Sequence, residues 1–469
     1  MSTEGAGAVH SRGARSGTGC AMQAGPKRPP APQGRHGLLP LRRFRRLRRL
    51  LELGAAILLG TAVVGREAWR ERRAGRVGWT RALGRGAARA CEVLGATFVK
   101  VGQIASTRSD ILPPAFTGEL ARLRDEVAPL PFEDVRAAVE GALGAPLAAL
   151  FEDFEPAPLG SASVAQVHGA RLPGGAEVAV KVRRPGIREQ IALDRALLLG
   201  LARGLERLVP SLRLVSLAEA VETFCEAVEL QTDFAREARN NRRFAQHFAD
   251  DPAIHLPKVH PELSGEAVLV MERIRGLREE ELVGHPGVDL EALVRNGMRC
   301  ICRMVFSHGL VHADLHPGNL RFLPPDRIAL LDVGLVAEIP DRDRITNAEL
   351  LFAFATGDGR TVARLFYENA PHRATPSYEA YEREVLALVE GVRRKGLAEV
   401  EIGLELARIF DILRRHRVQA RAHMTLVNLA LLAAEGLGKR LAPDLALAEA
   451  ALPYLTEALA GARASGGGG

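Results

Sequence analysis

The sequence has few cysteines and few lysines, and both shortages are informative. None of the five cysteines forms a C-x-x-C pair; they are Cys20, Cys91, Cys225, Cys300 and Cys302. This usage offers no disulfide framework and suits a reducing cytoplasm. Of the 63 basic residues only six are lysine. Because arginine serves wherever a positive charge alone is enough, the remaining lysines are enriched at positions that need a compact ammonium group.

Long apolar runs are also missing. The best candidate, residues 50–65, falls short of the roughly 20 apolar residues that a membrane span needs, and Glu52 interrupts it. We predict a packed helix there, and we expect no C-terminal segment to cross a bilayer. A bacterial-type cytoplasmic protein is expected, with any membrane association peripheral, on the inner face of the membrane.

The positive charge is concentrated at one end of the chain. The net charge is +7, but residues 1–90 contain 19 Lys and Arg against 4 Asp and Glu, a local +15, so the remainder carries −8. A basic globular body that binds nucleic acid is therefore not expected. Within residues 41–51, arginines separate apolar residues at every third position. Such a helix either lies on an anionic membrane or covers an acidic face of the same protein.

Residues 308–335 carry the pattern around which the chain is organised. The run His-Gly-Leu-Val-His-Ala-Asp-Leu-His-Pro-Gly-Asn places Asp314 five residues before Asn319, and Asp332 follows an apolar, strand-like run. This is the form of a protein-kinase catalytic loop followed by a D-x-G turn. One carboxylate faces the phosphoryl acceptor, while an amide oxygen and a second carboxylate hold Mg²⁺, which bridges nucleotide phosphates. The pattern predicts an ATP site.

A strand–turn–strand unit over residues 156–182 supplies a second part of that site. Valines alternate after a Pro-Gly-Gly turn, and Lys181 is the single polar interruption in Glu-Val-Ala-Val-Lys-Val. It matches the kinase strand lysine that contacts the α- and β-phosphates. The kinase glycine loop, G-x-G-x-x-G, is absent upstream. In its place is a small-residue loop that still lets backbone N–H groups approach phosphate, and its residues are Gly160, Ser161, Ala162 and Ser163.

A helical stretch over roughly residues 216–248 is expected to complete the environment of the lysine. Asp233, Glu237 and Asn240 recur at helical spacing, so they should share one face. A kinase requires a helix-borne glutamate that pairs with the strand lysine, and Glu237 is our candidate.

The rest of the chain is predicted to be mostly helical. Residues 266–276 are the exception, since they are predicted to form a strand that ends in a hinge, and we assign Met271 of this strand to the nucleotide site. Residues 288–307 are expected to form an apolar-periodic helix that leads into the catalytic loop. The helical pattern over residues 340–460 is typical of an α-rich second lobe.

Taken together and in this order, the motifs resemble those of the UbiB/AarF family of atypical protein-kinase-like proteins. The set covers about residues 92–440 and consists of Lys-Val-Gly-Gln, Ser-Ala-Ser-Val-Ala-Gln-Val-His, Val-Ala-Val-Lys, Asp-Phe-x-x-Glu-Ala-x-Asn, His-Ala-Asp-x-His-Pro-Gly-Asn and Asp-x-Gly. The resemblance implies an α+β, two-lobed protein-kinase-like fold, with a small β-containing N-lobe, an α-rich C-lobe and an N-terminal helical extension over the active site. It also implies ATP hydrolysis that supports ubiquinone or other prenyl-lipid biosynthesis at membranes. The partners it implies are ATP or ADP, an anionic membrane surface and lipid-biosynthesis enzymes.

The resemblance also assigns roles and boundaries. The residues it assigns are Lys100 and Gln103 for the inhibitory extension, Lys181 and Glu237 for the ion pair, Asp314 for the catalytic carboxylate, and Asn319 and Asp332 for Mg²⁺. The expected segments are a disordered tail (1–40), a basic helical segment (41–91), a helical extension with Lys-x-Gly-Gln (92–155), a kinase-like N-lobe (156–275), a kinase-like C-lobe (276–460) and a flexible tail (461–469).

Two positions depart from the family pattern. The family's acidic motif before the helix glutamate reads Glu-x-Asp, whereas this chain has Gln231-Thr232-Asp233, so one carboxylate is missing. The small-residue loop begins with Gly160 where alanine is common. Both changes bear on nucleotide grip and activity more than on the fold.

Two other functions stay open at this point. A pseudokinase or scaffold would bind nucleotide without turnover; the retained catalytic residues argue against it, and the missing carboxylate argues for it. A metallohydrolase would use the histidine-rich run as its ligand set, although no distal His or Asp group completes a first shell. The ligands in that case would be His308, His312, Asp314 and His316, but we interpret His312 as a residue that braces the loop.

Overall fold

The computed structural model describes residues 38–73, 79–106, 112–123, 127–208, 217–395 and 400–466. Its contacts divide the chain into two compact units, residues 1–48 and 49–469, and every contact described below lies within the second unit. Most of the predicted disordered tail, up to residue 37, lies outside the described residues. The side chains of residues 41–47, on which the predicted basic helix face depends, lie outside them as well.

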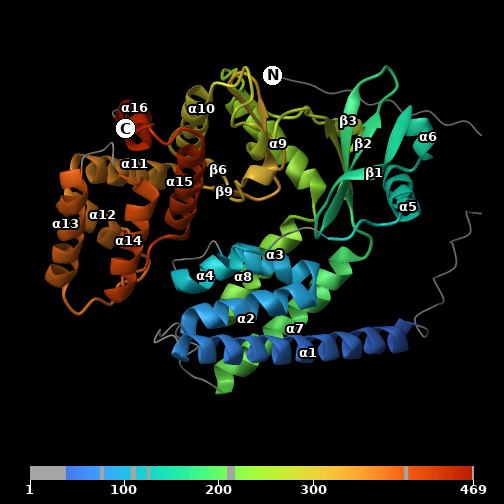
Figure 1. Ribbon diagram of the computed structural model, residues 1–469, viewed down its shortest axis with the longest axis horizontal. Helices are drawn as coiled ribbons and strands as arrows, with labels where there is room; N and C mark the ends of the chain where they lie inside the picture. Colours follow the sequence, from blue (N-terminus) through green and yellow to red (C-terminus); the bar gives the residue numbers. More distant parts are fainter. Residues whose placement is uncertain are drawn as a thin grey trace, which may run out of the picture. The chain divides into compact units, whose positions relative to one another are not determined.

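A four-stranded antiparallel sheet carries the strand lysine (Figure 1). Its strands are, in spatial order, β1 (Asp153–Ser161), β2 (Ala165–Arg171), β3 (Glu177–Arg183) and β5 (Val268–Glu272). The turn between β2 and β3 contains Gly174 and Gly175, whose positive φ angles of 99° and 88° are available to glycine without strain. The predicted strand–turn–strand unit is confirmed, and the later strand begins two residues inside the predicted range 266–276.

The two faces of this sheet have different partners. The valines of β3 pack against helix α5 (Phe132–Leu143). Because side chains alternate along a strand, Ala179 and Lys181 point to the other face. There Ala179 joins a buried cluster that includes residues of helix α9 (Phe234–His247). The alternation therefore places the lysine between the sheet and α9.

The helix that carries Glu237 is shorter than predicted. The expected single stretch over residues 216–248 is two helices, α8 (Leu217–Leu230) and α9, with a break between them. Asp233 has an extended backbone, and its carboxylate accepts a hydrogen bond from the Arg236 N–H at 3.2 Å, so it caps α9. The prediction that Asp233 shares a helix face with Glu237 is therefore wrong, because an N-cap residue lies outside the helical repeat.

Helices from two parts of the chain form what we call the extension bundle (Figure 1). Its members are α1 (Leu38–Arg73), α2 (Trp79–Leu94), α3 (Ala96–Ser106), α4 (Pro114–Leu120), α7 (Ile187–Leu208) and α8. Gly60 of α1 lies so close to α2 that an added Cβ would be 2.9 Å from the Gly86 carbonyl oxygen. Arg49 of α1 donates to Asp194 of α7 at 2.6 and 2.9 Å. Close backbone contact and a buried ion pair thus hold α1 in the bundle.

The predicted packed helix over residues 50–65 is part of α1, but only one of its faces is buried. Ala56 and Gly60 are buried, whereas Leu58 and Leu59 are exposed. Among the described residues, no helix combines the length and apolarity that crossing a membrane requires.

The second lobe is mainly helical, with a few short strands. Its helices are α10 (Leu290–Cys302), a π-helical turn (Arg303–His308), α11 (Asp341–Thr356), α12 (Gly359–Glu368), α13 (Tyr378–Lys395), α14 (Ile402–Arg415), α15 (Ala422–Leu441) and α16 (Leu447–Gly466). β6 (Leu310–His312) pairs with β9 (Val336–Glu338). A second small sheet has the order β4 (Ile254–His255), β8 (Arg327–Leu330) and β7 (Leu320–Leu323). Short elements elsewhere are α6 (Leu147–Leu150) and the 3₁₀ turns Pro261–Leu263, Glu279–Glu281 and Pro317–Asn319.

One large apolar core fills this second lobe. It runs from α10 and the π-helical turn through the short strands to α16. The short strands β6 to β9 emerge from this core and carry the catalytic-loop pattern at their ends. The chain therefore has the expected α+β arrangement, with a small sheet in one lobe and helices dominating the other.

Candidate active site

A cleft of about 1360 Å³ lies between the sheet, the loop that carries Asp314, and helix α3. Most of the residues predicted for the site line it: Lys100, Gln103, Gly160, Ser161, Ala162, Lys181, Met271, Asp314, Asn319 and Asp332. Ser163 and Glu237 are buried behind this lining. Segments far apart in the sequence thus meet at one cavity.

Lys181 is at the centre of a cluster of three charged groups. Its Nζ donates to both carboxylate oxygens of Glu237, at 2.9 and 2.8 Å, and to Oδ2 of Asp332 at 2.8 Å. Lys181 is 8% exposed and Glu237 only 2%, whereas Asp332 is partly open to the cleft. The strand lysine and the helix glutamate therefore form a buried ion pair, with a second carboxylate on the cleft side.

The cluster controls the protonation of its members. Burial disfavours the charge on Lys181, but the carboxylates of Asp332 and Glu237 outweigh it and raise the pKa of the ammonium group. Burial also raises the pKa of Glu237, and the charge of Asp332 adds to this effect while Lys181 opposes it. Burial disfavours the Asp332 carboxylate too, but Lys181 and the Gly334 N–H, 2.8 Å away, hold its pKa well below the usual range. Asp332 is therefore ionised at neutral pH.

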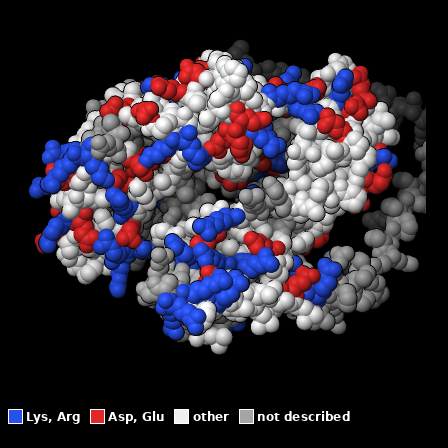
Figure 2. Space-filling view, viewed as in Figure 1, with Lys and Arg blue, Asp and Glu red and all other residues white. Residues whose placement is uncertain are grey.

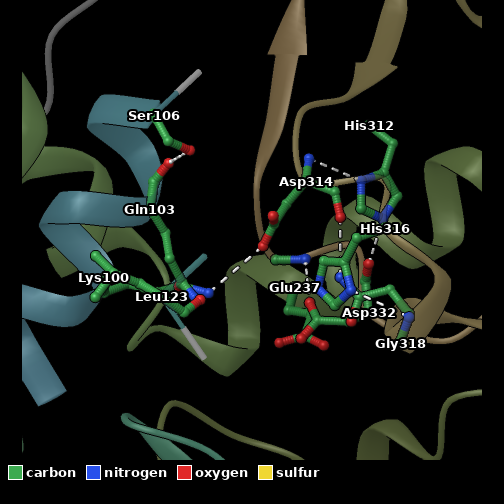
Figure 3. A network of polar contacts seen from close by, with 12 residues as sticks. Lys100, Gln103, Ser106, Leu123, Glu237, His312, Asp314, His316, Gly318 and Asp332 are labelled. Carbon is green, nitrogen blue, oxygen red and sulfur yellow. Dashed lines mark hydrogen bonds and ion pairs between the residues drawn. The ribbon is translucent and has the colours of Figure 1, made fainter. Parts of the chain in front are cut away.

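His312 braces the loop that carries Asp314 (Figure 3). Its Nδ1 accepts a hydrogen bond from the Asp314 N–H at 3.1 Å, and its Nε2 lies 2.5 Å from the Asp332 carbonyl oxygen. Because a carbonyl oxygen only accepts, Nε2 carries the proton. The buried ring thus joins the catalytic loop to the D-x-G turn, which is a bracing role and not a metal-binding one.

Asn319 and Asp332 present oxygen atoms that suit Mg²⁺. The Nδ2 of Asn319 donates to the Asp314 carbonyl oxygen at 3.0 Å, so Oδ1 is the atom of that amide that can bind a cation. Asp332 supplies an ionised carboxylate at the cleft. An amide oxygen and a carboxylate, completed by phosphate oxygens and water, form a donor set that Mg²⁺ accepts. The residues therefore fit the metal that the catalytic-loop pattern implies.

Helix α3 brings the extension bundle to the Asp314 carboxylate, which the sequence predicted to be catalytic. The Nζ of Lys100 lies 3.4 Å from Oδ2 of Asp314 (Figure 3). Gln103, one turn further along, donates from Nε2 to the Leu123 carbonyl oxygen at 3.1 Å. Ser106 in turn donates from Oγ to the Gln103 carbonyl oxygen at 2.6 Å. The extension therefore occupies the side of the cleft that Asp314 faces.

The small-residue loop and Met271 line the nucleotide side of the cleft. Met271 of β5 is buried and pairs with Ala179 of β3. A Cβ built on Gly160 has no atom within 4 Å, so packing does not impose glycine at this position. Ser163 is fully buried beneath the loop. Alanine at Gly160 would therefore fit without displacing a neighbour.

The position with the missing carboxylate lies away from the cleft. Gln231 is buried, and its Nε2 has no hydrogen-bond partner among the residues that the structure describes. Neither Gln231 nor Asp233 lines the cleft, and Asp233 is used as the cap of α9. The replacement of glutamate by Gln231 therefore removes no group from the cleft wall in this arrangement.

Several residues at the site were given no role from the sequence, although Asn240 and Gln166 lie within the motifs quoted there. Asn240 of α9 donates from Nδ2 to the Val333 carbonyl oxygen at 3.0 Å and so ties that helix to the D-x-G turn. Gln166 and Arg184 contact the small-residue loop. The sequence held one indication for Gln166: it and His168 are polar residues at alternate positions, between the apolar residues Ala165 and Val167 and the small Gly169.

The histidine-rich run does not gather into a metal site. Across the described ranges, no group of three or more His, Cys, Asp or Glu side chains is placed to hold a metal ion. His308 instead stacks on His247, with 4.4 Å between ring centroids. His316 accepts a hydrogen bond at Nδ1 from the Gly318 N–H at 3.1 Å. The metallohydrolase hypothesis is therefore left without its ligand set.

Fold and site together define a protein-kinase-like domain in which an N-terminal helical extension contacts the Asp314 carboxylate of the cleft. The family model of the ABC1 atypical kinase-like domain matches residues 122–366, and that of the UbiB helical domain matches residues 385–446. The chain belongs to the UbiB family of atypical kinase-like proteins. The family and the α+β kinase-like fold predicted from the sequence are both confirmed.

Known relatives agree with this assignment. The chain is 35% identical over 375 residues to "Probable protein kinase UbiB" of Marinobacter nauticus. The aligned residues cover 78% of this chain and 68% of the relative. It is 36% identical over 373 residues to the protein of the same name from Pseudomonas putida, covering 78% and 69%. Among solved structures, the Rv3197–erythromycin complex from Mycobacterium tuberculosis is 25% identical, with a TM-score of 0.47, over 75% of this chain and 94% of that one.

Proposed function

We propose that the protein binds Mg-ATP in this cleft and hydrolyses it, and that this activity supports ubiquinone or other prenyl-lipid biosynthesis at the membrane. The observation that carries the proposal is the convergence of Lys181, Asp314 and Asp332 on one cleft. The fixed positions of Glu237 and Asn319 behind and beside them add to it. The link to ubiquinone rests on the family resemblance.

The contacts of each side chain support one role in the proposed reaction. Lys181, held by Glu237, binds the α- and β-phosphates. Asn319 and Asp332 would hold Mg²⁺, which would supply positive charge beside the phosphoryl oxygens. Asp314 orients the attacking oxygen and accepts its proton.

The extension favours water over a protein as the attacking group. Lys100 lies at the carboxylate of Asp314, where the hydroxyl group of a peptide substrate would need to approach. A water molecule requires far less room than a peptide segment. Hydrolysis is therefore the reaction that this arrangement supports best.

The exposed face of α1 supports a peripheral position on an anionic membrane. Leu51, Leu58 and Trp69 are exposed and lie on one side of the helix. The guanidinium groups of Arg73 and Arg72 lie 4.0 Å and 5.3 Å from the ring centroids of Trp69 and Trp79. Tryptophan favours the membrane interface, and arginine is attracted to anionic lipid headgroups. Figure 2 shows further basic side chains gathered over α2 of the same bundle, whose sequence contains Arg81, Arg85 and Arg89.

ATP turnover by the full chain tests the enzymatic half of this proposal. We expect Mg²⁺-dependent hydrolysis that falls by about 10²- to 10⁴-fold in Asp314→Asn while Mg-ATP binding is kept. Asp341→Asn, which changes an exposed carboxylate elsewhere in the second lobe, is the matched control. Equal rates for wild type and Asp314→Asn would contradict the assignment of Asp314.

Vesicle co-sedimentation tests the membrane half. Vesicles with anionic lipid should retain the protein more strongly than zwitterionic vesicles, and Leu58→Asn together with Leu59→Asn should weaken retention. Equal binding to both kinds of vesicle would contradict this half of the proposal.

A nucleotide-binding scaffold is the second candidate function, and the contact between Lys100 and Asp314 favours it. It predicts Mg-ATP binding with no turnover, both with and without vesicles. The hydrolysis assay therefore separates the two functions directly.

A further inference from the structure

A guanidinium group holds the small-residue loop, which consists of the last two residues of β1 and the two that follow them. Arg184 directly follows β3, and its Nε donates to the Ala162 carbonyl oxygen at 2.8 Å. Its Nη2 donates to Ser161 Oγ at 2.7 Å and to the Ala128 carbonyl oxygen at 2.9 Å. One planar fork therefore joins the loop to residues 127–130, the segment that precedes α5.

A buried amide makes a second connection between the same two segments. Gln166 is completely buried, and its Oε1 accepts hydrogen bonds from the Leu130 N–H at 2.7 Å and from Ser161 Oγ at 3.4 Å. Its Nε2 lies 2.9 Å from Nε2 of His168, whose Nδ1 lies 2.8 Å from the Glu155 carbonyl oxygen. Because that carbonyl oxygen only accepts, Nδ1 of His168 carries the proton and Nε2 accepts from Gln166. The orientation of the amide is thereby fixed.

Backbone hydrogen bonds complete the enclosure of the loop. The Val127 N–H donates to the Ser161 carbonyl oxygen at 3.2 Å, and the Ala162 N–H donates to the Ala165 carbonyl oxygen at 2.8 Å. The Ser161 hydroxyl both donates and accepts within the protein. The loop therefore has its shape before any ligand arrives, whereas a glycine loop has more conformational freedom to lose.

We propose that Arg184 and Gln166 are positioning residues for nucleotide binding, which fix the small-residue loop to residues 127–130 as a preformed phosphate cradle. The nucleotide part of this inference rests on the proposed function, whereas the fixing of the loop does not. A loop that is already ordered loses less conformational entropy when it binds phosphate, so the affinity for nucleotide is higher.

Arg184→Lys is the variant that tests the clamp. The ammonium group keeps the charge but cannot reproduce the fork that reaches three acceptors. We expect faster amide hydrogen exchange over residues 158–166 in the ligand-free protein and a rise of about tenfold in KM for Mg-ATP, because charge-assisted hydrogen bonds are lost. The kcat should change less than about twofold, since the acid–base and metal-binding groups are untouched. General destabilisation would instead lower kcat by reducing the active fraction, without raising KM.

Two further variants keep the test decisive. Ser161→Ala removes the hydroxyl oxygen that accepts from Arg184 and leaves the arginine itself in place. It should speed amide exchange and raise KM, as Arg184→Lys does, but by a smaller factor. Arg188→Lys is the matched control, because Arg188 pairs with Glu266 at 2.8 Å and makes no contact with the loop in the described structure. It should leave exchange and KM unchanged.

The possible results separate this inference from the proposed function. Unchanged exchange and unchanged KM in Arg184→Lys would overturn the clamp even if wild type hydrolyses ATP normally. If wild type binds no nucleotide, the proposed function fails and the positioning role fails with it. In that case faster exchange in Arg184→Lys would still support the fixing of the loop, and unchanged exchange would overturn it.

Discussion

Two lysines reach carboxylates of the same cleft, and the protein holds them in different ways. Lys181 projects from a central strand and makes three contacts of 2.8–2.9 Å with Glu237 and Asp332. Lys100 projects from a helix of the extension bundle and reaches Asp314 at 3.4 Å. Both lysines are buried, at 8% exposure each, so the difference lies in their contacts. An ammonium group with three short contacts to carboxylates is costly to disturb, whereas a longer ion pair contributes less. We therefore expect the contacts of Lys181 to be needed for the stability of the fold, and the contact between Lys100 and Asp314 to be easier to break.

The largest effect is expected when the buried cluster loses its cation. Lys181→Met leaves Glu237 and Asp332 close together without the ammonium group that bonds to both, so the free energy of unfolding should fall by about 3–5 kcal/mol and Mg-ATP binding should be lost. Chemical denaturation and calorimetric titration measure the two effects. The double variant Lys181→Met/Glu237→Leu should recover most of the stability but none of the binding. Wild-type stability in the single variant would contradict the buried-cluster description.

A smaller effect is expected at the tie between α9 and the D-x-G turn. Asn240→Ala leaves the buried Val333 carbonyl oxygen without its donor, so the free energy of unfolding should fall by about 1–3 kcal/mol. Mg-ADP affinity should weaken several-fold, because the helix that positions Glu237 loses an anchor. Asn369→Ala breaks a similar amide-to-carbonyl bond far from the cleft and should leave affinity unchanged. Equal affinities in both variants would show that this tie does not serve the site.

The other end of α9 provides a pH-dependent effect. Burial lowers the pKa of His308 from 6.5 to about 4, and the neighbouring His247 and Arg303 add to this shift. Between these values the unfolded chain binds a proton that the folded chain does not, so stability should decline as the pH falls from 6.5 to about 4. Denaturation across this window should show a shallower decline for His308→Gln. The exposed control His372→Gln should keep the wild-type slope, and an unchanged slope in His308→Gln would contradict the assignment.

The smallest effect on stability is expected for the extension contact. Lys100→Ala should lower the free energy of unfolding by about 1 kcal/mol, because the pair with Asp314 is 3.4 Å long and the Asp314 side chain is 33% exposed. ATP hydrolysis should rise several-fold, because the catalytic carboxylate loses a competing cation. Lys395→Ala, which breaks a pair with Glu405 in the second lobe, should leave hydrolysis unchanged. A fall in hydrolysis for Lys100→Ala would indicate that the lysine assists the reaction.

The parts of the site that could be predicted depend on short-range geometry. Strict alternation along β3 determines which face Lys181 occupies, because a strand has a repeat of two. The spacing of Asp314, Asn319 and Asp332 lies within one short loop and the strands beside it, so few arrangements are compatible with it. These residues line one cleft in the structure.

The parts that could not be predicted depend on competing local roles and on long-range contacts. Asp233 has the spacing of a helix-face residue, but it serves as an N-cap, and spacing alone does not distinguish the two. Arg184 meets Ala128 only because the sheet and the preceding segment fold together. Residues 50–65 of α1 were predicted to be packed, and the apolar residues on all sides of this stretch did not indicate that Leu58 and Leu59 would remain exposed.

The most direct test of the account is the thermal unfolding of wild type and Asp332→Asn with and without Mg²⁺ and ADP. Asp332→Asn keeps the pair between Lys181 and Glu237, so the fold should survive while a metal ligand is lost. Ligand at about 100 times its Kd stabilises the native state by roughly 2.7 kcal/mol. We predict a clear Mg²⁺-dependent rise in the unfolding temperature of wild type that Asp332→Asn abolishes. No shift in wild type, or an equal shift in both proteins, would contradict a kinase-like nucleotide site in this cleft.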